Sequence, residues 1–456
     1  MRFWQLFKIP ILSSLISFSL YFVFAYHLDR TEYTKLIGLY ILLWLLFLVL
    51  MKFSKQNFKL LAIISFASRA IFILAIPNLS QDFYRFIWDG RMLIEGLNPY
   101  LYTPESFIEL NRFPVNQATE LYQGMGQLNG SHFTNYPPIK QLCFSLAALF
   151  SGHNILGSVV VLRLLLIAAD FGTLYYGKKL LERLKLPIHN IFWYILNPFI
   201  IIELIGNLHF EGMMIFFLML SLYLVHQKKW TWAAIVFSLS ISVKLIPLLF
   251  LPLFIKYFRR NNQQKTIDIK NLIWFYAIIG LSTATLFAPF FSLEFITNYS
   301  KTVGLWFNNF EFNASVYYLV REIGYLFRGY NEIAIIGKIL AGITFIAVLG
   351  LSFLRKNQTT KQLILNMLFA ISVYLFLSTT IHPWYLSTLL ILSVFTEYKF
   401  PIIWTFAVIL SYLAYLRFNA ADTSENLWVI ILEYAVVYSY LVWEVLKKVK
   451  LRSRYL

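Results

Sequence analysis

The sequence contains very little cysteine and very little charge. One of its 456 residues is a cysteine, Cys143, and 13% are charged. A single cysteine excludes an internal disulfide and a cysteine-rich metal site. The low charge, together with 59% hydrophobic residues, excludes a water-soluble fold, because apolar runs long enough to span a bilayer recur along the chain. We therefore expect an all-α polytopic membrane protein.

The sequence also lacks the parts of a nucleotide-using enzyme. It has no Gly-x-Gly-x-x-Gly or Walker-type loop, and no polar segment approaches the length of a nucleotide-binding domain. A net charge of +17 can indicate nucleic-acid binding, but the Lys and Arg residues gather in short connectors between apolar runs. The positive-inside bias and lipid headgroups account for that pattern. We expect membrane lipids as partners, no nucleic acid, and substrates that the membrane itself delivers.

The hydrophobic pattern predicts a single domain, residues 1–456, of about 12 to 14 transmembrane helices. The candidate spans lie near residues 9–26, 36–52, 59–77, 155–177, 189–205, 210–226, 230–243, 244–258, 271–291, 332–354, 361–380, 384–396, 400–417 and 427–446. Segment 137–150 fits the topology only as a re-entrant or partly inserted helix. Segment 230–258 is either two short spans or one kinked helix.

The polar segments between the spans gather on one side of the predicted membrane. When the basic connectors and both termini are placed in the cytoplasm, the other side of the cell membrane receives every long polar loop. These are a first extracytoplasmic loop at 78–136, a second at 292–331, and short turns at 207–211, 243–244 and 381–383. We expect an active site on that side.

Five ionisable residues lie within apolar runs: Arg69, Arg163, Asp170, Glu203 and Lys244. A charge near the bilayer centre costs on the order of 2.5–3.5 kcal/mol, so these side chains must face partners or a wet cavity. We expect an ion pair between Arg163 and Asp170. For Lys244 two readings stay open, binding of an anionic headgroup and snorkelling toward the interface.

The first loop contains the densest polar motif, residues 81–91. On a helix, Asp82, Arg85 and Asp89 would share one stripe. That stripe belongs either to a surface amphipathic helix, with Arg85 and Asp89 paired at i,i+4, or to the wall of a substrate cleft. Because Asp82 follows closely on the predicted span 59–77, we expect the rigid support that a catalytic carboxylate needs.

Two further motifs have two readings each. Pro137-Pro138, which follows Tyr136, either begins a helix or shapes a cleft. Asn197-Pro198 precedes a group of polar residues at the outer end of an apolar hairpin, which is either a solvated cap or a substrate-facing cluster. The members of that group are Glu203, Asn207, His209 and Glu211.

The motifs occur in a characteristic order. They are Asp82, Trp88-Asp89-Gly90-Arg91, Gly96-x-Asn98-Pro99-Tyr100, Tyr136-Pro137-Pro138, Asn197-Pro198, Asn207-x-His209-x-Glu211, Lys244-Leu245-Ile246-Pro247 and His382-Pro383-Trp384-Tyr385. This order resembles the integral-membrane glycosyltransferases of the C-type superfamily, and most closely bacterial mannosyltransferase-like members that use polyprenyl-phosphate sugars. The resemblance covers residues 80–390.

The resemblance implies a helical bundle with an acidic catalytic residue in its first outer loop. Asp82 matches that carboxylate, Asp89 and Arg91 the rest of the loop motif, and His209 with Glu211 the second outer motif. Many relatives have two adjacent acidic residues where this chain has Gln81-Asp82, and the second motif often ends in Asp. The first departure argues against a two-carboxylate metal site, so we predict no metal ligands; a divalent cation is compatible with the sequence but not required by it.

The expected reaction is a one-step inverting transfer of a hexose, mannose by resemblance, from a polyprenyl-phosphate donor to a glycan or glycolipid acceptor. Asp82 would act as general base toward the acceptor hydroxyl. The leaving phosphate needs neutralisation by fixed cations, for which Lys244, Arg85 and Arg321 are candidates. His382 would hydrogen-bond the phosphate or the sugar, while Tyr136 and Trp384 would offer faces for a sugar ring.

Two other classes of protein are alternatives. A transporter or flippase of a lipid-linked sugar or anion would explain intramembrane charges, but the chain shows no repeated halves and its polar groups gather on one side. An O-antigen-like polymerase or ligase would concentrate its working residues in one large late loop, and 292–331 is too short for that.

Overall fold

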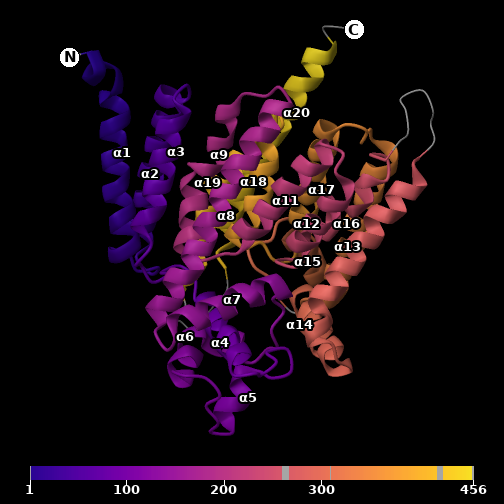
Figure 1. Ribbon diagram of the computed structural model, residues 1–456. Coiled ribbons are helices and arrows are strands. Elements are labelled where there is room, and N and C mark those ends of the chain that lie inside the picture. Colours follow the sequence, from indigo (N-terminus) through magenta and orange to yellow (C-terminus); the bar gives the residue numbers. More distant parts are fainter. Residues whose placement is uncertain (1, 259–266, 309, 418–424, 454–456) are drawn as a thin grey trace.

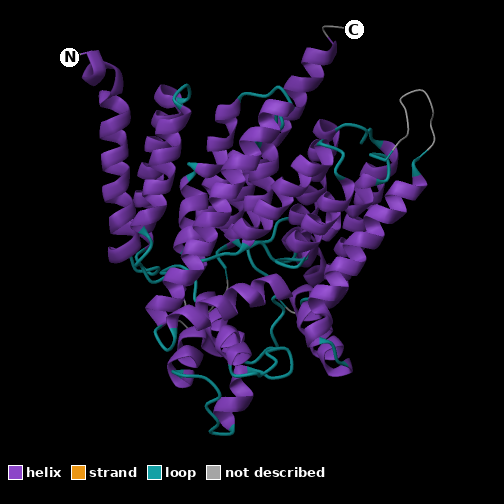
Figure 2. Ribbon diagram, viewed as in Figure 1, coloured by secondary structure: helices purple, strands orange, loops and turns teal. Residues whose placement is uncertain are grey.

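The computed structural model describes residues 2–258, 267–308, 310–417 and 425–453, and within these ranges it is built from helices (Figures 1 and 2). The expected all-α architecture is confirmed; Phe312 and Thr380 form an isolated β-bridge. Among the residues that the structure describes, seven helices are long and apolar enough to cross a membrane. They are α1 (Arg2–His27), α2 (Tyr33–Ser54), α8 (Ile155–Arg183), α13 (Ile269–Phe287, continued by η4, Ala288–Phe290), α16 (Ile333–Leu354), α17 (Thr360–Leu377) and α20 (Leu427–Ser453).

Several other predicted spans are shorter helices or broken ones. The segment Ile188–Ile195 plus Pro198–Gly206 is bent by 47° and would be an eighth span among the described residues. The described residues also include apolar helices of 10–17 residues, which are shorter than the roughly 20 residues that cross a bilayer. Because these helices do not count as spans by length, the number of spans is smaller than the expected 12 to 14. The remaining elements of the bundle are α3 (Phe58–Ile71), η1 (Ile188–Ile191), α9 (Phe192–Ile195), α10 (Pro198–Ile200), η2 (Ile201–Gly206, a π-helix), α11 (Glu211–His226), α12 (Trp230–Ile241), η3 (Ile246–Phe254), η5 (Pro383–Tyr385), α18 (Leu386–Ser393), α19 (Phe400–Ala407) and η6 (Val408–Arg417).

The predicted helix at 244–258 is absent as an α-helix. The chain turns at Lys244 and continues as the 3-10 helix η3, which contains Pro247 and Pro252. Proline lacks the N–H that a helix interior needs and clashes with the preceding turn, so two prolines five residues apart prevent a regular α-helix here. Lys244 therefore lies in a connection between α12 and η3.

The first polar loop forms a separate helical lobe, which we call the lobe: α4 (Asp82–Ile94), α5 (Pro104–Glu109), α6 (Ala118–Gly130) and α7 (Pro138–Ser151). Figure 1 places it at the end of the bundle opposite the start of α1 and the end of α20, with α7 running crosswise beneath the long helices. Pro138 occupies the first turn of α7, a position where proline is tolerated. With 14 residues, α7 is shorter than the roughly 20 residues that cross a bilayer, and the expected re-entrant or partly inserted position of this segment stays a prediction. The second polar segment forms α14 (Leu293–Asn308) and α15 (Val316–Arg328).

A close approach between α4 and α7 depends on one glycine. A Cβ at Gly90 would lie 2.2 Å from the Phe144 carbonyl oxygen, so no other residue fits there without a shift of backbone.

The charged side chains of α4 around Gly90 are buried: Arg85, Asp89 and Arg91 are each less than 5% exposed. The prediction that the stripe of Asp82, Arg85 and Asp89 faces water or a cleft is wrong for Arg85 and Asp89, whereas Asp82 does line a cavity. The i,i+4 pair expected between Arg85 and Asp89 is present, and it lies buried within the lobe.

Arg163 and Asp170 do not pair with each other, which corrects the expected ion pair. Asp170 Oδ2 instead accepts a hydrogen bond of 2.8 Å from Arg69 Nε, and both side chains are fully buried. Two residues seven positions apart on α8 lie about two turns, or roughly 10 Å, along the helix, which leaves each side chain to find a partner on another element.

Arg163 has no carboxylate partner among the described residues; its guanidinium instead donates hydrogen bonds to four backbone carbonyls. It donates to the oxygens of Ile73 and Ala75 at 3.0 and 2.7 Å, and to those of Ile205 and Gly206, each at 2.9 Å. Carbonyls at helix ends lack intrahelical partners, and burying them unpaired is costly. Arg163 therefore stabilises the early end of α3, at Ile71 rather than at the predicted 77, and the end of η2.

Candidate active site

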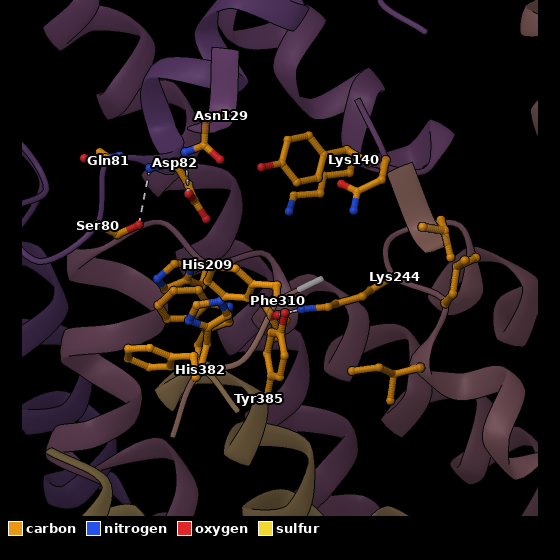
Figure 3. Close-up of a pocket in the computed structure, with 18 of the residues that line it drawn as sticks. Ser80, Gln81, Asp82, Asn129, Lys140, His209, Lys244, Phe310, His382 and Tyr385 are labelled. Carbon is orange, nitrogen blue, oxygen red and sulfur yellow. Dashed lines mark hydrogen bonds and ion pairs between the residues drawn. The ribbon is translucent and has the colours of Figure 1, made fainter. Parts of the chain in front are cut away.

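A cavity of about 760 Å³ lies where the lobe meets the connections between helices. Six of the ten predicted site residues line it: Asp82, Tyr136, His209, Glu211, Lys244 and His382. In Figure 3, Asp82 and Lys140 lie opposite His209, His382 and Tyr385, and the Lys244 side chain extends between the two groups. Residues far apart in the sequence thus meet around one space.

Asp82 is the first residue of α4, rather than a residue at the end of a spanning helix. Its backbone N–H donates to Ser80 Oγ, and its Oδ1 accepts a hydrogen bond from Asn129 Nδ2, each at 3.3 Å. The positive end of the helix dipole favours a carboxylate at this position. Removal from bulk water raises the pKa of Asp82, while Lys140 and Asn129 act in the opposite direction and Glu211 adds to the increase. A raised pKa makes the carboxylate a stronger base.

Lys140 is a cavity residue that the sequence analysis did not identify. Its Nζ lies 4.0 Å from the centre of the Tyr136 ring and 4.6 Å from that of Phe86, with Phe144 and Phe210 within 6 Å. The lysine is the third residue of α7, so it begins an apolar run instead of interrupting one. Lys140 lies within the predicted segment 137–150, and the rule that flags charges inside apolar runs would have identified it if it had been applied to that segment as well as to the candidate spans.

Lys244 forms an ion pair with Glu211, the first residue of α11. Its ammonium also lies over the Tyr385 ring, 4.0 Å from the ring centre. Glu211 is almost fully buried, whereas Lys244 is about a quarter exposed. A carboxylate of the same chain thus partners Lys244 at the cavity wall, and the two expected readings for this lysine stay predictions.

Two histidines flank one tryptophan. The rings of His209 and Trp384 are nearly parallel with centres 3.6 Å apart, and those of His382 and Trp384 have centres 4.6 Å apart at 2°. Burial and the neighbouring lysines lower the pKa of His209 well below its usual value and that of His382 to about 3, so both imidazoles are neutral near pH 7. Trp384 is only 9% exposed, which leaves it little face for the sugar ring that we expected it to contact.

The position of His382 is fixed by pairing with a distant segment. Phe312 N–H donates to Thr379 O at 3.1 Å, and Ile381 N–H donates to Phe312 O at 2.8 Å. Within the described ranges, His382 Nδ1 and His209 Nε2 are buried without a hydrogen-bond partner. Buried polar atoms in this state are commonly satisfied by water or a ligand. The two imidazoles can therefore donate to or accept from a bound sugar.

The other four predicted site residues lie outside the cavity wall. Arg85 Nε donates to Asp89 Oδ1 at 2.7 Å, and its Nη1 donates to the carbonyls of Asn129 and His132. Asp89 also accepts from Gln141 at 3.0 Å. Arg85 binds the backbone of Asn129, and the Asn129 side chain binds Asp82. The Arg85–Asp89 pair therefore helps to fix the position of Asp82 at the cavity wall.

Arg91 and Arg321 are likewise held by protein groups. Arg91 donates to the Asn116 carbonyl and the Gln117 side chain within the lobe. Arg321, on α15, forms ion pairs with Glu311 and Glu322. Glu311 is one of the residues that line the cavity, whereas Arg321 is not.

In the residues for which the structure gives positions, no group of three or more His, Cys, Asp or Glu side chains could hold a metal ion. The expectation of a reaction that needs no protein-bound metal stays a prediction.

Comparison with known proteins adds a family. Residues 19–259 match the family model described as "Alpha-(1->6)-mannopyranosyltransferase, N-terminal domain". The chain is 22% identical over 194 residues to alpha-(1->6)-mannopyranosyltransferase A of Mycobacterium tuberculosis, covering 42% of this chain and 36% of that protein. It is 23% identical over 186 residues to the protein of the same name from Corynebacterium glutamicum, covering 40% and 35%. The chain thus matches about a third of the length of these curated relatives. The family match includes Asp82, Lys140, Glu211 and Lys244.

Proposed function

The chain belongs to the alpha-(1->6)-mannopyranosyltransferase family, and from this premise we propose that it transfers a mannosyl group from a polyprenyl-phosphate donor to a hydroxyl of a glycan or glycolipid. The observation that carries the proposal is the position of Asp82. Its carboxylate lines a cavity that is large enough for a sugar and that also contains two lysines, Lys140 and Lys244. A base and fixed cations around one space are the groups that such a transfer requires.

The proposed step is a single displacement. Asp82 takes the proton of the acceptor hydroxyl, whose oxygen attacks the anomeric carbon of the donor. The bond between that carbon and the phosphate oxygen breaks, and its electron pair leaves with the phosphate. The products are a glycoside of inverted configuration and a lipid phosphate. The leaving group is already an anion, so it needs a nearby cation more than it needs a proton.

A transfer assay tests this function. The purified protein in detergent receives a radiolabelled polyprenyl-phosphate mannose and a panel of mannose-containing acceptors. We expect labelled product with the wild-type protein and a loss of about 10²- to 10⁴-fold with Asp82→Asn, the usual contribution of a general base. The melting temperature of the variant should match that of the wild type. Full activity in Asp82→Asn would remove Asp82 from the mechanism, and no transfer by the wild type to any acceptor would refute the donor class.

We also propose that the cavity faces the extracytoplasmic side. The lobe lies opposite the start of α1 and the end of α20 (Figure 1), and basic connectors favour the cytoplasm. The native Cys143 is buried, so an added cysteine can be labelled selectively. Leu110 in the lobe is 64% exposed. In intact cells, Leu110→Cys should react with a membrane-impermeant maleimide; labelling only after cell lysis would reverse the topology.

A further inference from the structure

The aromatic surroundings of Lys140 leave its ammonium group incompletely satisfied. The residue is 8% exposed, and the contacts around its Nζ are ring faces, of which Tyr136 and Phe86 are the nearest. Ring faces attract a cation, at roughly 0.5–2 kcal/mol each, but they do not accept its three N–H bonds as oxygen atoms do. Within the described ranges, no carboxylate forms an ion pair with Lys140 and no oxygen accepts a hydrogen bond from its ammonium group.

The second cavity lysine differs in this respect. Lys244 has the carboxylate of Glu211 as a direct partner, which already neutralises its charge. Asp82, Glu211 and Asp89 influence Lys140 only through space. Of the two lysines that line the cavity, Lys140 is thus the one whose N–H donors are available to an anionic ligand.

We propose that Lys140 binds the phosphate of the lipid-linked donor and neutralises it as the sugar leaves. This inference rests on the proposed function, because that function supplies a phosphate as the leaving group. The four rings surround the ammonium on the side away from solvent and leave the residue 8% exposed, so its interaction with an anion is stronger than in bulk solvent. A charge-assisted hydrogen bond from Lys140 to a phosphate oxygen would supply the missing acceptor.

The protonation state of Lys140 gives the proposal a pH signature. Burial lowers the pKa of Lys140 to about 8; Glu211, Asp82 and Asp89 act to raise it and Lys244 to lower it. Only the protonated amine attracts the phosphate, so donor affinity should fall as the pH rises through about 8. Arginine at this position stays charged throughout that range, which provides a variant without the signature.

Binding of farnesyl phosphate to the purified protein in detergent tests the proposal, with farnesol and inorganic phosphate as comparison ligands. We expect Lys140→Gln to weaken farnesyl phosphate binding by about 10- to 100-fold, as the loss of a charged hydrogen bond does. Lys140→Arg should keep most of the affinity and should lose the decrease above pH 8. Lys178→Gln is the matched control, since Lys178 also lies over a ring, that of Phe58 at 4.9 Å, but outside the cavity.

The outcomes separate this inference from the function on which it rests. Equal farnesyl phosphate affinity in the wild type and Lys140→Gln, with mannosyl transfer intact in the wild type, would overturn the role of Lys140 alone. Farnesol bound as tightly as farnesyl phosphate, or inorganic phosphate competing equally well, would overturn the assignment to a lipid phosphate. A wild-type protein that neither binds farnesyl phosphate nor transfers mannose would refute the function and the inference together. A lower melting temperature in Lys140→Gln with unchanged affinity would show a structural role.

Discussion

The charges buried among the long helices and the charges that line the cavity differ in how they are paired. Arg69 and Asp170 form a direct ion pair with both side chains fully buried, and Arg163 binds four carbonyls. In the cavity, Asp82 has one long hydrogen bond from Asn129, and Lys140 has ring faces for neighbours. Apart from the Lys244–Glu211 pair on the cavity wall, residues of the same types therefore serve structure in one region and lie open to a ligand in the other.

The comparison shows that an ionisable residue in a membrane protein is not by itself a sign of function. The cost of burying a charge can be offset by protein groups, as for Arg163, or by contact with a space that water and substrate fill, as for Asp82. The second arrangement places hydrogen-bonding groups where a ligand can reach them, whereas the Arg69 and Asp170 atoms that lack partners are fully buried away from the cavity. The distinguishing feature is the partner of each charge, which a sequence does not specify.

The largest effect is expected from breaking the fully buried pair. Asp170→Asn leaves the Arg69 charge buried without its counterion, and removal of one member of such a pair typically costs about 3–5 kcal/mol of unfolding free energy. Thermal unfolding of the purified variant should show a large decrease in melting temperature, whereas Asp82→Asn should show none. Replacement of both residues, Arg69→Met with Asp170→Leu, should recover most of the loss. An unchanged melting temperature in Asp170→Asn would remove the difference between the two regions.

Asp89 offers an intermediate case, because it lies on the same helix as Asp82 but is paired. Asp89→Asn removes the charge that holds Arg85, which in turn binds the backbone of Asn129. We expect a lower melting temperature and a reduced kcat, with the KM for the donor changed less than about threefold, since a group that does not touch substrate leaves ground-state binding unaffected. A large rise in KM with normal stability would instead return Asp89 to the substrate contacts that the sequence predicted.

Most of the residues that meet at the cavity could be predicted from the sequence, but the contacts of the charged side chains around it could not. The order of motifs placed Asp82, Tyr136, His209, Glu211, Lys244 and His382 together, because they follow or precede apolar runs on one side of the membrane. It misplaced Arg85 and Asp89, since helical spacing shows that two residues share a stripe but not what the stripe packs against. The α7 helix covers that stripe, and its crosswise position is a tertiary feature.

The pairing of buried charges was also beyond the sequence. Arg163 and Asp170 lie on one helix and seemed natural partners, yet Arg69 is the partner of Asp170 from another helix. The surroundings of Lys140 could not be predicted either, because they are made by rings from α4, α7 and the turn at Phe210. Contacts of this kind depend on packing between segments that no local pattern connects.

A smaller effect, on pH dependence, tests whether the cavity charges act on one another. Asp82 must be deprotonated to act as base, so kcat/KM should fall as the pH decreases through its raised pKa. The positive charge of Lys140 lowers that pKa and the negative charge of Glu211 raises it. The acidic limb of the profile should therefore move to higher pH in Lys140→Gln and to lower pH in Glu211→Gln. Shifts of the same sign in both variants would contradict direct electrostatic coupling.

The smallest effect is expected at Arg321, a predicted phosphate contact that lies neither among the long helices nor on the cavity wall. Its guanidinium already pairs with Glu311 and Glu322, and Glu322 is more than half exposed. Ion pairs near the surface contribute at most about 1 kcal/mol, so Arg321→Gln should change transfer and donor affinity by less than about fivefold. Lys140→Gln, measured in parallel with farnesyl phosphate, should exceed it by a clear margin. If the order were reversed, the anion would bind beside Glu311 and α15, and the pairing of a cation would no longer indicate whether it is available to substrate.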